Sequence, residues 1–179
     1  MPRSKITYFC LLVDSSEIRL LIAKLRNSKS PGPDDIGPKV IKLSVDIIGE
    51  HLTHVFNVSI STGCVPEQLK LAKVIPLFKK GATYLPGNYR PISLLNILYK
   101  LLEKVMYNRL YNHLQAKNIL YDFQFGFRKN YSTTLALVDV VDNIYKHLDD
   151  GKLGVGIYLD LQKAFDTVNH RILLRKLYH

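Results

Sequence analysis

Cysteine, acidic side chains and long apolar runs are all scarce in this sequence of 179 residues. Its two cysteines, Cys10 and Cys64, lack the spacing of a zinc site or a disulfide framework, which favours a reducing compartment. No uninterrupted apolar run approaches the ~20 residues that a membrane-spanning helix needs, so no membrane partner is expected. The absence of a repeat or low-complexity tract leaves a folded globular chain as the simplest expectation.

The charged residues are divided unequally between the two signs. Lys and Arg number 25 against 15 Asp and Glu, which gives a formal net charge of +10. Such a surplus attracts polyanions, and nucleic acid is the partner that it favours. A solvated cationic face without a partner explains the same composition. Because 47% of the residues are apolar, the chain has enough material for a sizeable hydrophobic core.

Helical patterns dominate the first part of the chain. Asp14 and Glu17 have the spacing of a capping box, which predicts an amphipathic helix after them. Two prolines and a glycine within residues 27–35 predict a turn, whose two aspartates would cap the next helix. Pro38 fits the first turn of that helix. A helix is then predicted over residues 40–61, with this apolar stripe: Ile47, Ile48, Leu52, Val55 and Phe56.

Strand patterns enter after a glycine and a proline interrupt that helix. Residues 73–78 and 89–94 read as the two strands of a hairpin, in which Pro76 favours a sheet edge. The strongest helical stripe follows and predicts a helix to about Leu114: Ile97, Leu98, Leu101, Leu102, Val105, Met106 and Leu110.

The last third of the chain mixes both patterns. Ser132 or Thr133 fits the start of another helix. Apolar residues alternate along residues 153–161, which predicts a strand against a core. A last helix is expected from about Val168. Helices followed by strands mixed with helices predict an α+β fold, with helix-rich segments and a short hairpin leading into a first sheet strand.

Asp160 stands near the end of this otherwise apolar predicted strand. A buried carboxylate without a partner costs on the order of several kcal/mol. A bound cation, a hydrogen-bond donor or water removes much of that cost. The simpler interpretation is an aspartate that caps the following turn. The functional interpretation is a ligand for a divalent metal, since Mg²⁺ takes one or two carboxylates together with substrate phosphates.

Residues 158–170, Tyr-Leu-Asp-Leu-Gln-Lys-Ala-Phe-Asp-Thr-Val-Asn-His, closely resemble the first catalytic palm motif of reverse transcriptases. Their form is typical of jockey-like and related LINE (non-LTR) retrotransposons. The resemblance implies that Asp160 is catalytic and binds the magnesium ions, helped by the backbone carbonyl of Leu161. It also implies that Phe165 is the steric gate that disfavours a ribose 2′-hydroxyl.

Three further segments resemble the same family in order and spacing, so the resemblance spans about residues 14–179. Residues 29–34, Lys-Ser-Pro-Gly-Pro-Asp, look like its turn upstream of the fingers, although a purely structural loop explains them and no catalytic role is assigned. Residues 88–95, Asn-Tyr-Arg-Pro-Ile-Ser-Leu-Leu, look like its first fingers motif. Residues 124–128, Gln-Phe-Gly-Phe-Arg, resemble the second.

The resemblance assigns roles to basic residues that also have simpler explanations. Arg90 would bind the incoming triphosphate, because a planar guanidinium suits phosphate oxygens, although a solvent-facing arginine is the commoner case. Lys79, or Lys80 beside it, would supply a second cation. Gln124 and Arg128 would contact the template or the nucleotide, while the two phenylalanines between them fit a hydrophobic core as well as a stacking platform.

The function that the resemblance implies is RNA-directed DNA polymerisation by two-metal nucleotidyl transfer, with Mg²⁺, or Mn²⁺, as the cofactor. The expected partners are an RNA template, a DNA primer and deoxynucleoside triphosphates. Residues up to about 152 would form the N-terminal extension and fingers, and residues 153–179 the start of the palm. Asp160 is the only recognisable member of the metal cluster, and the remainder of the palm and the thumb are missing. The chain alone is therefore expected to be inactive.

Two alternatives remain open at this point. The chain could be a non-catalytic nucleic-acid-binding remnant of a retroelement, in which Asp160 is idle. It could also belong to another reverse transcriptase lineage, such as an intron-encoded maturase, although residues 88–94 and 124–128 together argue against that. The family suggests the nucleus or the cytoplasm as its location. The segment after Leu153 is expected to be the least stable, because a central strand without its neighbours leaves backbone groups unpaired.

Overall fold

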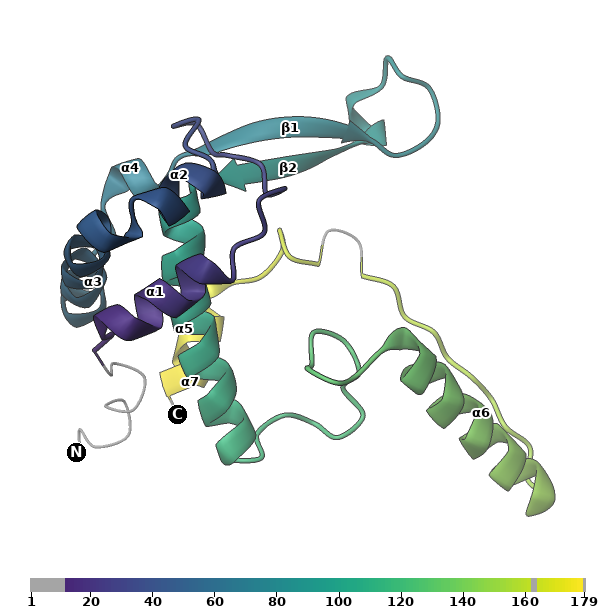
Figure 1. Ribbon diagram of the computed structural model, residues 1–179. Helices are drawn as coiled ribbons and strands as arrows, with labels where there is room; N and C mark the ends of the chain where they lie inside the picture. The colour runs from purple at the N-terminus through teal and green to yellow at the C-terminus, as the bar shows by residue number, and fades with distance from the viewer. Residues whose placement is uncertain (1–11, 162–163, 179) are drawn as a thin grey trace. The chain divides into compact units, whose positions relative to one another are not determined.

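The computed structural model describes residues 12–161 and 164–178, and the chain divides by packing into two units, Met1–His113 and Leu114–His179 (Figure 1). In chain order the elements are α1 (Ser15–Ala23), α2 (Pro38–Leu43), α3 (Val45–Thr62), α4 (Glu67–Lys70), β1 (Ala72–Phe78), the 3-10 helix η2 (Pro86–Asn88), β2 (Tyr89–Leu95), α5 (Ile97–Ala116), α6 (Thr133–Asp149) and α7 (His170–Tyr178). Helices and one two-stranded sheet confirm the predicted α+β class. The boundary between fingers and palm near residue 152 stays a prediction.

Asp14 begins α1, as predicted. Its side chain accepts a hydrogen bond from the backbone N–H of Glu17 at 3.0 Å. Hydrogen bonds from the Ser16 side chain and from this N–H stabilise the carboxylate, so the pKa of Asp14 lies below its ordinary value of 3.8. The Glu17 carboxylate in turn pairs with the Arg109 guanidinium of α5, at 3.1 Å between Oε2 and Nη2. The cap and the ion pair together fix the start of α1 and its place beside α5.

Two helices, α2 and α3, replace the single helix predicted over residues 40–61. Pro38 is the first residue of α2, as predicted, and Gly37 is its N-cap. Ser44 ends α2 and begins α3, and its hydroxyl donates to the carbonyl four residues earlier at 2.9 Å. The prediction of one continuous helix was therefore wrong at this residue, because apolar periodicity does not report a local bond from side chain to backbone. α3 ends at Gly63, whose φ of +70° favours glycine.

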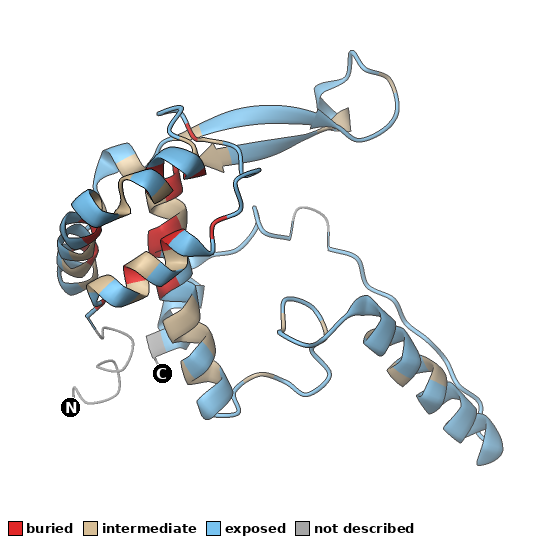
Figure 2. Ribbon diagram, in the orientation of Figure 1, coloured by how far each residue is buried: buried red, intermediate tan, exposed pale blue. Residues whose placement is uncertain are grey.

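The buried side chains of the described residues all lie in the N-terminal unit (Figure 2). Their apolar members form one cluster: Val13, Ile18, Ile22, Leu25, Ile41, Leu52, Phe56, Ile97, Leu101, Leu102 and Val105. The predicted stripe of α5 is confirmed for the last four of these, whereas Met106 is 39% exposed. The stripe predicted for α3 holds for Leu52 and Phe56 but not for Ile47, which is 75% exposed. Packing of α1, α2, α3 and α5 around this cluster is the main source of stability.

The predicted hairpin is formed by β1 and β2. The strands are antiparallel, with Ala72 paired to Leu95 and Phe78 paired to Tyr89. The Phe78 and Tyr89 rings lie 5.4 Å apart between centroids, at the end of the ladder next to the connecting loop. Most residues of both strands are exposed. Because an isolated two-stranded ribbon is marginally stable in water, this hairpin depends on the bonds that shape its loop.

The C-terminal unit contains no buried side chain among its described residues. Ser132 caps α6, as predicted, and accepts a hydrogen bond from the Leu135 N–H at 3.2 Å. The strand predicted over residues 153–161 is not formed: this segment is extended, exposed and unpaired. That prediction was wrong because a strand is stable only beside a neighbour, and none of the described residues pairs with it. No helix in the described part of the chain has the length and apolarity to cross a bilayer.

Candidate functional site

The turn at residues 29–34 packs its glycine against the start of α5. Gly32 is buried, and a Cβ atom placed on it would lie 2.5 Å from the Asn96 Cα and 2.7 Å from the Leu95 carbonyl carbon. Only glycine fits so close an approach of two backbones. The Asp34 side chain accepts from the Ile36 N–H at 3.3 Å, and no side chain caps α2, so the predicted capping by the aspartates is wrong. The turn has a structural role, as its simpler interpretation expected.

The first two residues of the segment 88–95 close the loop of the hairpin. The Asn88 side chain donates to the Ala82 carbonyl at 2.8 Å, and the Tyr89 hydroxyl donates to the Thr83 carbonyl at 2.8 Å. Gly81, with a φ of +95°, lies against Asn88, whose Nδ2 would be 2.7 Å from an added Cβ. These two hydrogen bonds hold the loop against the start of β2, the strand that carries Arg90.

Arg90 is exposed on β2, directly opposite Leu77. Side chains alternate between the faces of a strand, so the residues two before and two after Leu77 share its face. Those residues include Lys79, whose N–H continues the ladder by donating to the Asn88 carbonyl at 2.8 Å. Lys79 therefore shares a face with Arg90, whereas Lys80 lies in the bend beyond the ladder. The geometry favours Lys79 of the two candidates for a second cation.

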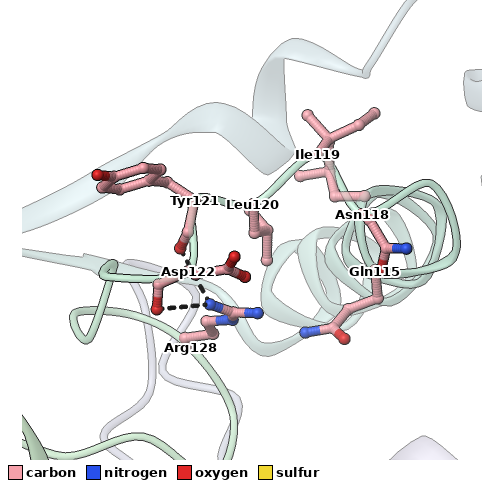
Figure 3. Close-up of a pocket in the computed structure, with 8 residues that line it drawn as sticks. Gln115, Asn118, Ile119, Leu120, Tyr121, Asp122 and Arg128 are labelled. Carbon is pink, nitrogen blue, oxygen red and sulfur yellow. Dashed lines mark hydrogen bonds between the residues drawn. The ribbon is translucent and has the colours of Figure 1, made fainter.

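Arg128 holds a loop of the C-terminal unit together (Figure 3). Its Nη1 donates to the carbonyls of Tyr121 at 3.0 Å and Asp122 at 3.4 Å, and its Cζ lies 4.3 Å from the centroid of the Tyr131 ring. It also lines a pocket of about 500 Å³ whose other polar walls include Asn118 and Asp122. Its Nε is buried without a hydrogen-bond partner in the described structure. The guanidinium is thus mainly structural here, and a contact with template or nucleotide stays a prediction.

The other members of this segment lie at the surface. Gln124 donates from Nε2 to the Gly126 carbonyl at 3.2 Å. Phe125 packs its ring edge-on against Tyr131, at 5.7 Å between centroids. Phe127 is 86% exposed and has a φ of +58°, so a place in the core is excluded for it. A positive φ is uncommon for a bulky side chain.

Phe127 and Phe165 are brought together from two separate motifs. Their rings meet edge to face, at 5.9 Å between centroids and an interplanar angle of 89°. Edge-to-face pairs of this kind are favourable by about 0.5–1.5 kcal/mol beyond their buried area. Phe165 is itself 77% exposed, so the pair stands on the surface of the C-terminal unit. Sequence reasoning did not anticipate the contact, because nothing in the spacing of the motifs reports it.

Asp160 and Leu161 lie in the extended segment that precedes this aromatic residue, and both are exposed. Among the described residues, no three side chains of His, Cys, Asp or Glu come together in a group able to hold a metal ion. Magnesium is commonly bound by one or two carboxylates together with substrate phosphates and water. The described residues therefore do not make up a magnesium site by themselves. Arg90 and Asp160 belong to different packing units, and each is positioned only within its own.

The motif residues resemble those of one family, and comparison with known proteins identifies it. The model of the family "Reverse transcriptase (RNA-dependent DNA polymerase)" matches residues 77–179, which include the end of β1, all of β2, the loop of Arg128 and Asp160. The chain belongs to the reverse transcriptase family.

Relatives of the chain come from mobile elements and confirm the predicted jockey-like affiliation. It is 36% identical over 165 residues to an RNA-directed DNA polymerase from the mobile element jockey of Drosophila melanogaster, and 34% identical to that of Drosophila funebris. Each alignment covers 92% of this chain and 18% of the relative. A probable RNA-directed DNA polymerase from transposon BS of Drosophila melanogaster is 36% identical, over 89% of this chain and 18% of the relative. The chain thus spans about a fifth of the length of these relatives.

Proposed function

We propose that this chain is a segment of an RNA-directed DNA polymerase from a non-LTR mobile element, in which it takes part in extending a primer with deoxynucleotides. The observation that carries the proposal is the family match over residues 77–179, which spans the segments of both Arg90 and Asp160. The net charge of +10 supports a polyanionic partner. RNA template, DNA primer and deoxynucleoside triphosphates are the partners proposed for the whole protein.

In this proposal the exposed face of the hairpin holds the triphosphate. Arg90 and Lys79 share that face, and a planar guanidinium beside an ammonium is suited to phosphate oxygens. Asp160 would supply one carboxylate to a magnesium site, with the Leu161 carbonyl beside it. Phe165 would exclude a ribose 2′-hydroxyl, with Phe127 against its ring. The two-metal reaction is proposed only for a protein that contributes the remaining metal ligands.

By itself the chain is expected to bind nucleic acid without extending a primer, since its described residues bring no three His, Cys, Asp or Glu side chains together in a group able to hold a metal ion. The test is primer extension on an RNA template with Mg²⁺ or Mn²⁺, using the chain alone and a chimera. In the chimera, this chain replaces the aligned segment of the jockey polymerase. Extension is expected from the chimera and not from the chain alone or from the chimera carrying Asp160→Asn. A chimera that folds and extends a primer equally well with Asp160→Asn would refute the role of this carboxylate.

A second candidate is a non-catalytic nucleic-acid-binding protein of retroelement descent. The observation in its favour is that Asp160 is solvent-exposed and is not part of a metal-binding group in the described structure. Both candidates predict salt-dependent binding of RNA or DNA. They differ in the chimera, where a remnant would fail to restore extension although the protein folds and binds the primer and template.

A further inference from the structure

A cluster of lysines, among them the first residue of the segment 29–34, surrounds a pocket in the N-terminal unit. The pocket lies between the end of α1, the loop that follows it and the first turns of α5, and its volume is about 360 Å³. We call it the lysine pocket, and its charged and aromatic lining consists of Lys24, Lys29, Lys100, Lys104, Glu103 and Tyr107. A volume of this size is at the lower end of the range typical of small-ligand sites.

The wall of the lysine pocket is built on the hydrophobic core. Leu25 and Leu101 line it and are both members of the buried cluster. Lys100 is tied to the loop, because its Nζ donates to the Ser30 carbonyl at 3.0 Å. Lys24, Lys29 and Lys104 are exposed. The apolar wall and Lys100 are therefore the preorganised part of the pocket, which lowers the entropy that a ligand must lose on binding.

Positive charge in the lysine pocket is not neutralised by the protein. Four lysines face one carboxylate, that of Glu103, and none of the four ammoniums lies within 4.0 Å of a carboxylate in the described residues. Burial, together with repulsion from the Lys29 ammonium, lowers the pKa of Lys100. Burial raises the pKa of Glu103, the one carboxylate in the pocket lining, while the Asp34 carboxylate also acts on Lys100 from outside that lining. An anion in the pocket would relieve this repulsion between like charges.

The aromatic residues of α5 extend the same surface. Lys100, Lys104, Tyr107 and Tyr111 follow each other at spacings of three or four residues, so they form one stripe of the helix. The Lys104 Nζ lies 4.3 Å from the centroid of the Tyr107 ring, and that ring stacks on Tyr111 at 5.5 Å. The ring contact orients the lysine beside the pocket at little cost in side-chain freedom.

We propose that the lysine pocket binds a phosphate group of a nucleic-acid strand, as a backbone contact independent of the polymerase site. Four ammonium groups around a concave surface match phosphate oxygens in charge, and lysine is a common phosphate ligand. Contacts of this kind position a strand without reading its bases. An anionic membrane fits less well, because an inserting surface needs a broad apolar face next to its cations. Here the aromatic part of the stripe is one exposed tyrosine, Tyr107, stacked on the half-buried Tyr111, beside charged lysines.

The inference rests on the proposed function only in taking nucleic acid as the partner. Its residues are separate from Arg90 and Asp160, so the two proposals fail in different experiments. Loss of primer extension in the chimera would leave binding at the lysine pocket intact. A result showing that the lysine pocket does not bind nucleic acid would not affect the roles proposed for Arg90 and Asp160.

The first test removes two charges from the pocket and two from elsewhere on the same unit. Lys29→Gln with Lys104→Gln leaves the structural bond of Lys100 in place, and Lys39→Gln with Lys42→Gln on α2 is the matched control. Fluorescence anisotropy with a labelled single-stranded 12-mer of RNA or of DNA is measured over a range of salt concentrations. The pocket variant is expected to bind roughly tenfold more weakly and to lower the salt slope by about 1.4, since each phosphate contact on a single strand contributes about 0.7. The control is expected to bind within about twofold of the wild type, because it loses only distant charges that salt screens.

The second test places a reporter in the pocket. The sequence contains no tryptophan, so Tyr107→Trp introduces a single indole at the edge of the lysine pocket and keeps a ring for Lys104. Its emission is expected to change when the 12-mer is added, and to change far less with inorganic phosphate or deoxythymidine triphosphate at equal phosphate concentration. An equal response to the triphosphate would mean a nucleotide site and would overturn the backbone proposal.

Three outcomes of the binding series would also overturn it. One is equal weakening by the pocket variant and by the α2 control at unchanged helix content. Another is binding to vesicles of phosphatidylcholine and phosphatidylserine that depends on Lys29 and Lys104 as strongly as binding to the 12-mer does. The third is displacement of the 12-mer by polyglutamate as effectively as by unlabelled oligonucleotide, which would mean an acidic protein partner.

Discussion

Replacing Gly32 by alanine tests how the turn at residues 29–34 is held. The added methyl would lie 2.5 Å from both the N and the Cα of Asn96 and 2.7 Å from the carbonyl carbon of Leu95. These distances are about 1 Å shorter than an ordinary contact between non-bonded carbon atoms. The opposing atoms belong to the backbone at the start of α5, so they cannot rotate away as a side chain would. Either the turn or the helix start has to move.

The size of the effect follows from two opposing contributions. Overpacking of a close contact costs about 1–3 kcal/mol, and a backbone contact belongs at the upper end of that range. Alanine also restricts the unfolded chain, which offsets about 0.4–1 kcal/mol. We therefore expect Gly32→Ala to lower the free energy of unfolding by about 2 kcal/mol. With a urea dependence of about 2 kcal/mol per molar, the midpoint of unfolding should fall by about 1 M.

The assay is urea unfolding followed by circular dichroism, together with hydrogen exchange of the α5 amides that belong to the buried cluster. Gly87→Ala is the matched control, because it lies in the same unit and has nothing within 4 Å of an added Cβ. It should change the free energy of unfolding by less than about 0.5 kcal/mol, as an open surface position does. The reasoning is refuted if Gly32→Ala unfolds at the same urea concentration as this control, because the turn would then not be packed against Asn96.

Two further predictions concern the start of α1. Arg109→Ala is expected to lower the free energy of unfolding by about 1–2 kcal/mol, because it removes a paired guanidinium whose side chain is only 11% exposed. The loss is limited because the partner Glu17 is 32% exposed in the wild type and is therefore partly solvated. A urea midpoint that does not change within error would contradict this prediction. The depressed pKa of Asp14 means that its charged cap contributes stability above pH 3.8, and that this contribution is lost as the pH falls through the lowered folded-state pKa. The control is Asp14→Asn, whose side chain caps the helix without a charge. The wild type should unfold at a higher urea concentration than this variant at neutral pH, and the difference should disappear only below about pH 4. A difference in urea midpoint that stays constant from pH 7 to pH 2 would refute the contribution of the charge.

The parts of the fold that the sequence predicted are those set by neighbours in the chain. The caps at Asp14 and Ser132 and the proline at the start of α2 act within one helical turn, so their spacing is enough to find them. The break at Ser44 was missed, because apolar residues continue on both sides of it and only a hydroxyl bond marks it. The close approach at Gly32 was likewise invisible, since its neighbour Asn96 is distant in sequence.

For the site, sequence patterns predicted the residue types but not how they are used. From the sequence, Arg90 and Arg128 had the same interpretation: each is an arginine in a segment that resembles a motif of the family. In the structure Arg90 is exposed on a strand, whereas Arg128 is engaged by backbone carbonyls and by the Tyr131 ring. The choice between Lys79 and Lys80 needed the register of the hairpin. The lysine pocket could not be predicted at all, because its lysines come from two separate segments that only the buried cluster brings together.

The segment at residues 153–161 shows most directly what a sequence pattern does and does not establish. Its alternation of apolar and small or polar residues describes the two faces that a strand would have in a sheet, but a strand has no stability of its own without hydrogen bonds to a neighbour. In the structure Leu153, Val155 and Ile157 are 98%, 88% and 82% exposed, and no strand among the described residues lies beside them. Their backbone groups make no ladder hydrogen bonds, and their apolar side chains are not buried. The alternating pattern therefore describes a strand that needs neighbouring strands, and no described residue pairs with this segment.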